Sequence, residues 1–387
     1  MAPTKGPSLS GERFHVTYRI AAPNEAAARD RANALCVEQT VEFPADLLPP
    51  GPIANQIVGR IEALSPAPRS KDIALMPPAF IVNITYAAEI VGEDLTQLLN
   101  VIFGNSSLKR GLRVEALSLS PRLGRRFSGP RFGRSGLRDL CDAHDRPLLC
   151  SALKPLGLSP RDLATFAGAF AEGGIDLIKD DHGLADQPFC RFAERTERCA
   201  AAVAEANAKT GGKTRYIANI SFDAAGLFQR ATQARRVGVD GFLIAPGLVG
   251  FSTVEKLARD DTLAAPLLCH PALLGSFVVH PDSGLAPSLA FGTLPRLAGC
   301  DATIFPNAGG RFGFTQTDCA QIAQACDAPL ATLAPIFPVP AGGMRLDRVE
   351  ELRATYGKES ILLIGGDLHR SNDLVARCRH FCDLVRG

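Results

Sequence analysis

The residues best suited to chemistry are four consecutive polar side chains, Lys179, Asp180, Asp181 and His182, which follow an apolar run at 175–178. A lysine in apolar surroundings is driven towards its neutral form, in which it can act as a base or a nucleophile. Carboxylate oxygens are the ligands that Mg²⁺ prefers, so Asp181 is a candidate metal ligand. An ordinary ion pair of Lys179 with Asp180 or Asp181 is the alternative.

Polar side chains also follow other short apolar runs in the second half of the chain. Lys154 follows the first run, His270 the fifth, and Asn307 and Arg311 the sixth. If these runs are parallel strands of one barrel, their carboxyl ends meet at one mouth, where barrel enzymes carry their active sites. We therefore predict that these side chains gather there with Lys179, although a lone histidine is more often a core residue.

Glycine pairs follow the last two apolar runs, as Gly342 and Gly343 and as Gly365 and Gly366. Glycine lets backbone N–H groups approach closely, and the loops after the last two strands of a barrel frequently bind phosphate. Both pairs are predicted to bind a phosphorylated small molecule. Tight turns without a ligand are the alternative.

The alternation of apolar runs and amphipathic stretches predicts a (β/α)8 TIM barrel of the α/β class. The expected strands are 146–153, 175–178, 214–221, 241–245, 266–269, 302–305, 333–337 and 361–364. The expected helices include 160–172, 191–208, 224–237 and 346–356. An open doubly wound sheet is the alternative, but no Gly-rich dinucleotide turn follows the first strand.

The N-terminal part has a different pattern, which predicts a smaller α+β sandwich domain. Its expected strands are 13–20, 40–43, 79–84 and 114–119, and its expected helices are 24–35 and 93–103. A stretch rich in Pro, Gly and Arg at 121–134 reads as a linker. The predicted domains are therefore 1–134, with the linker, and 135–387, the catalytic barrel.

Composition excludes several classes of function. The chain has 387 residues, 46% of them hydrophobic, and a formal net charge of +2, which argues against a nucleic-acid partner. No apolar run approaches the roughly 20 residues needed to span a bilayer, and residues 1–12 carry no apolar signal region. Eleven cysteines without a CxxC pair indicate free thiols. A cytoplasmic protein is expected.

Several of these segments, in this order, resemble the RuBisCO large-chain superfamily. They are LKP at 153–155, GGID at 173–176 with KDD at 179–181, DQPF at 186–189, EQTVE at 38–42 and GN at 104–105. The spacing inside 173–181 is highly specific, and the resemblance covers nearly the whole chain.

The resemblance implies a role for each matching position. Lys179 is similar to the lysine that takes up CO2 to become a carbamate, which with Asp181 would ligate one Mg²⁺ per site. Lys154 resembles the lysine beside the enolate. The resemblance also implies a homodimer in which Glu38 and Asn105 of one subunit complete the site of the other. The glycine pairs and Asn307 would bind the phosphorylated substrate.

The departures from the family pattern are equally informative. Carboxylases carry Lys-Asp-Asp-Glu, whereas His182 stands at the third metal-ligand position here, and imidazole is a poorer ligand for Mg²⁺ than carboxylate. Pro271 follows His270 where carboxylases place arginine. Arg311 stands near the position of the lysine that handles CO2, and arginine stays protonated. The chain therefore resembles a RuBisCO-like protein, form IV, and not a ribulose-bisphosphate carboxylase.

Because these departures from the carboxylase pattern argue against carboxylation, the expected function is enolate chemistry on a phosphorylated carbonyl compound. Because Arg311 suits a substrate with an extra carboxylate, cleavage of a C–C bond in a 3-oxo-isoapionate 4-phosphate-like sugar acid is the favoured hypothesis. The alternatives are 5-methylthioribulose 1-phosphate isomerase and diketo-methylthiopentyl phosphate enolase of sulfur salvage. A non-catalytic homologue with a binding or regulatory role is a further alternative, since a fold does not guarantee its usual chemistry.

Overall fold

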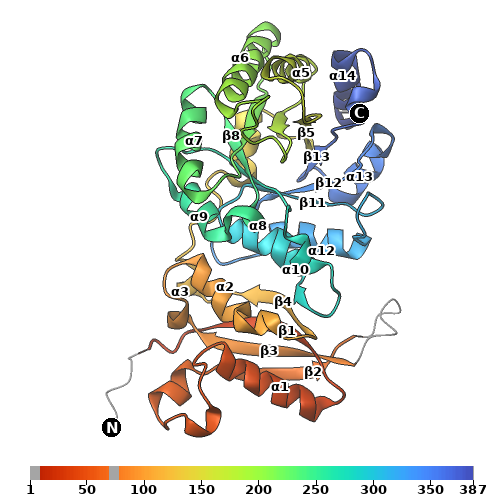
Figure 1. Cartoon of the computed structure of the whole chain (residues 1–387). Coiled ribbons are helices and arrows are strands. Elements are labelled where there is room, and N and C mark those ends of the chain that lie inside the picture. Colours follow the sequence, from red (N-terminus) through yellow and green to blue (C-terminus); the bar gives the residue numbers. More distant parts are fainter. Residues whose placement is uncertain (1–8, 69–77, 387) are drawn as a thin grey trace. The chain divides into compact units, whose positions relative to one another are not determined.

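A computed structural model describes residues 9–68 and 78–386 (Figure 1). The described chain divides into two compact units. The first unit runs to Ser128 and also includes 274–293 and 329–333, and the remainder forms the second unit. Two segments from the second half of the sequence therefore pack with the N-terminal part, which the sequence pattern did not indicate.

The first unit is built on one mixed sheet. Its strand order is β10 (Gly284–Leu285), β4 (Leu112–Ser118), β1 (Arg13–Ala21), β3 (Ala79–Ala87) and β2 (Arg60–Pro66). Alternate side chains of β1 are buried, as expected for a sheet with one covered face. Helix α1 (Glu25–Glu38) buries Ala28, Ala32 and Leu35, and α2 (Leu95–Phe103) follows β3. The predicted α+β architecture is confirmed.

The second unit contains an eight-stranded parallel sheet curled into a nearly closed barrel (Figure 1). Its strands, in sequence order, are β5 (Leu148–Leu153), β6 (Leu177–Asp180), β7 (Arg215–Asn219), β8 (Gly241–Ile244), β9 (Leu267–Cys269), β11 (Ala302–Pro306), β12 (Phe337–Ala341) and β13 (Ile361–Leu363). β13 pairs with β5, whereas β12 pairs only with β11 among the described strands. The predicted barrel is confirmed.

Helices alternate with these strands along the chain. They include α5 (Pro160–Glu172), α6 (Phe192–Thr210), α7 (Ala224–Arg236), α9 (Phe251–Arg259), α12 (Gln316–Asp327), α13 (Val349–Tyr356) and α14 (Leu374–Arg386). Ser159 caps α5 in a capping box with Asp162, and Pro160 occupies its first turn, which explains why the start of this helix was predictable.

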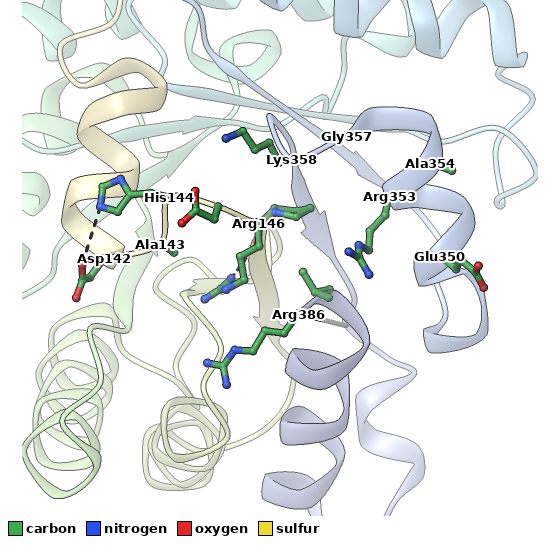
Figure 2. Close-up of a pocket in the computed structure, with 13 residues that line it drawn as sticks. Asp142, Ala143, His144, Arg146, Glu350, Arg353, Ala354, Gly357, Lys358 and Arg386 are labelled. Atoms are coloured by element: carbon green, nitrogen blue, oxygen red, sulfur yellow. Dashed lines mark hydrogen bonds and ion pairs between the residues drawn. The ribbon is translucent and has the colours of Figure 1, made fainter.

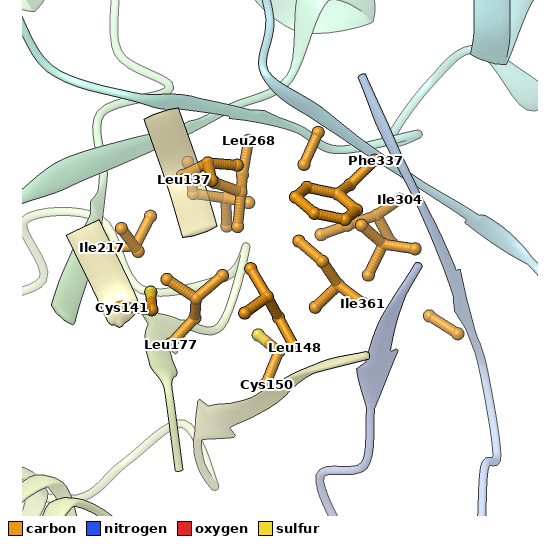
Figure 3. Close-up of a cluster of buried hydrophobic side chains, with 14 of the residues drawn as sticks. Leu137, Cys141, Leu148, Cys150, Leu177, Ile217, Leu268, Ile304, Phe337 and Ile361 are labelled. Carbon is orange, nitrogen blue, oxygen red and sulfur yellow. The ribbon is translucent and has the colours of Figure 1, made fainter. Parts of the chain in front are cut away.

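The barrel interior is filled by side chains from all eight strands of this sheet (Figure 3). Leu148, Leu177, Ile217 and Leu268 belong to this cluster, and α4 (Gly133–Cys141) adds Leu137 and Cys141. Successive strand residues alternate between the two faces of a sheet. Residues two and four positions after Leu177, which are Lys179 and Asp181, therefore continue the inward-facing row.

The strand expected at 40–43 was wrong. Residues 39–41 form a turn, and Glu42 has φ of 45°, a left-handed conformation that ends an extended segment. The N–H groups of Val41 and Glu42 both donate to the carbonyl of Val37, at 3.0 and 3.1 Å. The end of α1 thus uses the donors that a sheet would need. In contrast, β2 was missed because its side chains are mostly exposed and lack clear alternation.

The seventh barrel strand lies later than the predicted 333–337 and spans Phe337–Ala341. Pro338 and Pro340 hid it, since proline removes a ladder donor from a central strand. In β12, the residues other than these two prolines direct their N–H groups towards β11. The prolines face the other side, where β12 has no ladder partner among the described strands. The second strand is also shifted, to Leu177–Asp180, so Lys179 and Asp180 are part of the strand.

The cysteines are free and buried, as the sequence predicts. No helix within residues 9–68 and 78–386 is both long and apolar enough to cross a membrane.

Candidate active site

Lys179 is almost completely buried in β6, with 3% of its surface exposed. Its Nζ donates to the carbonyl of Asp180 at 3.0 Å. Burial lowers the pKa of Lys179, and the charge of Lys154 lowers it further, while Asp181 partly opposes the shift. A buried lysine with a lowered pKa is a better base and nucleophile than an exposed one.

Asp181 is paired with Lys154 at the mouth of the barrel. Its Oδ1 lies 3.0 Å from Nζ of Lys154 and 3.7 Å from Nδ1 of His182. Burial alone would raise the pKa of Asp181, but His182 and the charges of Lys179 and Lys154 outweigh it and hold the pKa well below its usual range. Asp181 is therefore a carboxylate. Its ion pair is with Lys154, and not with Lys179 as the sequence alternative had it.

Asp180 faces the other way and anchors the site to the barrel wall. Its Oδ2 accepts from Nε of Arg195 at 3.2 Å and from the backbone N–H of Asn219 at 3.0 Å, and its Oδ1 accepts from the hydroxyl of Tyr216 at 2.8 Å. The side chains of Asp180 and Arg195 are both 0% exposed. Burial alone would lower the pKa of Arg195, but the Asp180 charge outweighs it and raises the pKa.

The loop after β6 is held by Asn219. Its Nδ2 donates to the carbonyls of His182 at 3.0 Å and of Leu184 at 2.8 Å. Arg195 donates to the carbonyl of Ala185 in the same loop, at 2.8 Å. The sequence did not reveal Arg195 or Tyr216, because neither stands at the end of a strand. The only sequence feature that pointed to Arg195 and Tyr216 was a polar group within an apolar pattern.

His270 is stacked on His182, with ring centroids 4.3 Å apart and planes inclined by 16°. Burial, with the nearby charge of Lys179, lowers the pKa of His270 to about 2. Its Nδ1 accepts from the backbone N–H of Ala272 at 3.2 Å, so the ring proton is placed on Nε2. His270 is thus a neutral hydrogen-bond donor. We define Lys154, Lys179, Asp181, His182 and His270 as the mouth cluster.

The loop after β11 packs on the glycine pair after β12. The N–H of Arg311 donates to the carbonyl of Gly342 at 3.1 Å, and the guanidinium of Arg311 lies 5.6 Å from the ring centroid of Phe312. Gly342 and Gly343 have φ of 94° and 93°, which other residues rarely adopt. These glycines therefore have a role in backbone geometry, whether or not they also bind phosphate.

Asn307 is directed by a residue that the sequence did not single out. Its Oδ1 accepts a hydrogen bond from the hydroxyl of Tyr356, at the end of α13, and its Nδ2 lies 3.3 Å from the carbonyl of Ala308. Asn307 is 5% exposed. The structure thus shows Asn307 holding the loop that carries Arg311, and its predicted contact with a substrate stays a prediction.

The second glycine pair lies beside the mouth cluster. A side chain added at Gly365 would lie 3.5 Å from Cε of Lys154, whereas Gly366 has open space around it. The segment that follows forms a short 3₁₀ turn, η8 (Leu368–Arg370), before α14 begins at Leu374.

Glu38 and Asn105 belong to the first unit. Nδ2 of Asn105 donates to Oε1 of Glu38 at 3.2 Å, so the two predicted partners of the site lie together. Their predicted role at the mouth of another subunit is not tested by one chain.

A cavity of 670 Å³ lies at the amino ends of barrel strands, away from these residues (Figure 2). It is lined by the loop 142–147 before β5, by Gly357 and Lys358 before β13, and by parts of α13 and α14. Two of its arginines bind neighbouring groups: Arg146 pairs with Asp176 at 2.6 Å, and Arg353 donates to the carbonyl of Leu384 at 3.0 Å. None of the predicted site residues lines it.

Comparison with known proteins identifies the family. The model of the ribulose bisphosphate carboxylase large chain, catalytic domain, matches residues 133–372. The 5-methylthioribulose-1-phosphate isomerase of Rhodospirillum rubrum is 42% identical over 363 residues, which cover 94% of this chain and 93% of that protein. A 2,3-diketo-5-methylthiopentyl-1-phosphate enolase of Geobacillus kaustophilus is 34% identical over 296 residues, which cover 76% of this chain and 71% of the enolase.

Solved structures agree with this relationship. The crystal structure of a Rubisco-like protein from Rhodopseudomonas palustris superposes with a TM-score of 0.85 at 39% identity, covering 97% of each chain. Ribulose bisphosphate carboxylase-like protein 1 from the same species is 40% identical over 358 residues, which cover 92% of this chain and 93% of that protein. The chain therefore belongs to the RuBisCO large-chain family and is a RuBisCO-like protein of form IV, the non-carboxylating type.

Proposed function

We propose that this protein isomerises a phosphorylated ketose through an enolate, with 5-methylthioribulose 1-phosphate as the leading substrate. The observation that carries the proposal is the buried Lys179 beside Asp181 at the carboxyl ends of the barrel strands. A basic group in such a place, as the lysine or as its carbamate, suits proton abstraction next to a carbonyl. The isomerase named for the relative with 42% identity supports the choice of substrate.

Isomerisation of a ketose moves two protons and leaves atoms and electrons balanced. A base removes a proton from the hydroxyl-bearing carbon beside the carbonyl, which gives an enediolate. A proton is then added to the former carbonyl carbon, while the hydroxyl proton passes from the oxygen of the first carbon to that of the second. The candidate bases are a carbamate on Lys179 and the amine of Lys154, and burial lowers the pKa of Lys179, which favours the neutral amine from which a carbamate forms. His270 carries its proton on Nε2, which makes it a candidate donor to the substrate oxygen on which charge develops.

The mouth cluster fits one Mg²⁺ if Lys179 carries a carbamate. Asp181 is an ionised carboxylate, and a carbamate on the neighbouring Lys179 would add a second anionic oxygen ligand, with His182 as the third group. One or two carboxylates with substrate oxygens make up a usual Mg²⁺ site. When bound, Mg²⁺ supplies Lewis-acid polarisation of the carbonyl. Within the described residues, no three His, Cys, Asp or Glu side chains form such a site alone, so the carbamate is essential to it.

The phosphate of the substrate would bind at the two glycine pairs. Gly366 has open space around it, and Lys154 lies along Gly365, so a phosphate there would contact backbone N–H groups beside an ammonium group. Glu38 and Asn105 would complete the site from the other subunit of a homodimer. Their mutual hydrogen bond supports a shared function for the two residues.

The cleavage of a phosphorylated sugar acid, which Arg311 suggested, is not confirmed by the comparisons. Arg311 is exposed on the loop after β11, so it remains able to meet a substrate carboxylate. The relatives named above instead support the sulfur-salvage alternatives, isomerase and enolase. The burial of Lys179 argues against the non-catalytic alternative, since burying a lysine without function is costly.

An exchange experiment tests the proposal. The protein is incubated in D2O with Mg²⁺, bicarbonate and, separately, 5-methylthioribulose 1-phosphate, a diketo-methylthiopentyl phosphate and a phosphorylated 3-oxo sugar acid, and NMR follows each mixture. We expect deuterium uptake and an isomeric ketose phosphate from the first compound only. A product from either of the others reassigns the substrate, and no exchange with any compound contradicts enolisation.

A second prediction concerns the loop that carries Arg311. Tyr356→Phe removes the hydroxyl that binds Asn307, so the loop loses one hydrogen bond of about 1 kcal/mol. We expect kcat/KM on the active substrate to fall about fivefold. Tyr86→Phe, which removes a buried hydroxyl in the first unit, is the matched control and should leave kcat/KM unchanged. Equal effects of the two substitutions on kcat/KM would contradict a specific role for Tyr356.

A further inference from the structure

The feature that carries a further inference is the ion pair between Lys154 and Asp181. Nζ of Lys154 lies 3.0 Å from Oδ1 of Asp181, a distance at which the two groups are in direct contact. The same oxygen is the one nearest to His182, at 3.7 Å. Oδ1 is therefore the oxygen of Asp181 that points into the mouth cluster, and it is the oxygen that a metal ion in the cluster would use.

We propose that Lys154 competes with a divalent cation for Oδ1 of Asp181, so that binding of the metal releases the lysine towards Gly365 and Gly366. An ammonium group and a metal ion are both cations that need the same lone pairs of one carboxylate, and they repel each other at such short range. The inference rests on the metal placement proposed above, and it does not depend on which substrate is turned over.

The surroundings of Lys154 show where its ammonium group would go. The stem of the side chain lies along Gly365, whose absent side chain leaves Cε of Lys154 3.5 Å from the Cβ position. Gly366, next in the chain, has open space around it. A lysine that leaves Asp181 therefore stays beside the glycine pair proposed to bind phosphate. Metal and an anionic substrate would then favour each other's binding, because each draws Lys154 out of its pair with Asp181.

The pair is exposed enough to exchange partners. The side chains of Lys154 and Asp181 are 36% and 20% exposed, whereas the pair beneath them, Asp180 and Arg195, is fully buried. A partly exposed ion pair contributes little stability, so a divalent cation can displace it at small cost. The buried pair has no such freedom, which confines the exchange to the mouth cluster.

The test is a metal titration and needs no turnover. Binding of Mn²⁺, used as a probe for the Mg²⁺ site, is measured by EPR at saturating bicarbonate and constant pH. Lys154→Met is expected to bind Mn²⁺ about fivefold more tightly than the unmodified protein, because the competing cation is gone. An unchanged or weaker affinity would overturn the proposal.

Two further variants separate competition from a general effect of charge. Lys209→Met removes a lysine with an equally short ion pair, Nζ to Oε1 of Glu172 at 3.0 Å, on helices outside the mouth cluster, and should not change the affinity. In an Asp181→Asn background, Lys154→Met should bring no gain, because the contested carboxylate is absent. A gain in either variant would overturn the proposal.

The outcomes also separate this inference from the proposed isomerisation. If Mn²⁺ binds neither to the unmodified protein nor to Lys154→Met, the metal placement and the competition both fail, while exchange of the ketose phosphate in D2O is judged by its own experiment. If Lys154→Met binds Mn²⁺ more tightly but no substrate exchanges, the competition stands and the isomerisation fails. Circular dichroism and a thermal melt confirm that each variant is folded.

Discussion

Lys179→Met should lower turnover of the active substrate by about 10³-fold, the range typical of losing a positioned acid–base group. Lys179 is buried in the mouth cluster, and β6 contains no other lysine. Methionine has a similar length and carries no charge, so it fills the space without burying an unpaired group. The free energy of unfolding should therefore stay the same or rise, and urea unfolding measures it beside kcat.

The control for Lys179 is Lys209→Met, which removes an exposed lysine and should leave kcat unchanged. Incubation with ¹³C-bicarbonate adds a second readout, since a carbamate on Lys179 would give a carbon signal that Lys179→Met lacks. Full turnover by Lys179→Met would contradict the assignment of Lys179 as the base and as the site of the carbamate. Loss of turnover together with loss of folding would instead show a structural role.

Asp180→Asn should destabilise the protein by roughly 3–5 kcal/mol, because it leaves Arg195 charged and buried without its carboxylate. Arg195 keeps its hydrogen bond to the carbonyl of Ala185, but its Nη2 is buried and makes no hydrogen bond within the described part of the chain. Asparagine keeps one acceptor oxygen, so either the hydroxyl of Tyr216 or the N–H of Asn219 also loses its acceptor. The midpoint of urea unfolding measures the effect.

Glu194→Gln provides a matched control on the same helix as Arg195. It removes the ion pair with Arg198, which at 2.8 Å is shorter than the pair of Arg195 with Asp180 at 3.2 Å, but about half of each side chain is exposed. An exposed pair contributes about 0.2–1 kcal/mol. If both substitutions had the same small effect, burial would not govern the strength of these pairs and the anchoring role of Asp180 would be refuted.

The fold was predictable where hydrophobic pattern and end signals agree. The capping box and Pro160 mark the start of α5, and the alternation of apolar and polar residues marks β1. The pattern failed where tertiary context decides. Pro338 and Pro340 lie inside a strand because the side they face lacks a ladder partner among the described strands. That absence depends on how the whole sheet is paired and not on residues 337–341.

The mouth cluster was predictable in its members but not in its pairings. Lys179 and Asp181 are two residues apart on a strand, so their shared face follows from the sequence alone. The same alternation turns Asp180 outward, yet its partners lie 15 and 36 residues further along the chain, in α6 and β7. Nothing in the local sequence names Arg195 or Tyr216, and the stacking of His182 on His270 likewise depends on the curvature of the sheet.

The barrel wall should open most easily between β12 and β13, which are not paired with each other. Within the described strands, β12 forms backbone hydrogen bonds with a neighbouring strand on one side only, and its prolines cannot donate hydrogen bonds on the other side. Next to these strands, the N–H of Leu346 donates to the side chain of Asp367 at 3.1 Å and so joins the two glycine loops. We expect local opening to begin at the strands that carry both glycine pairs, so that their amide hydrogens exchange first.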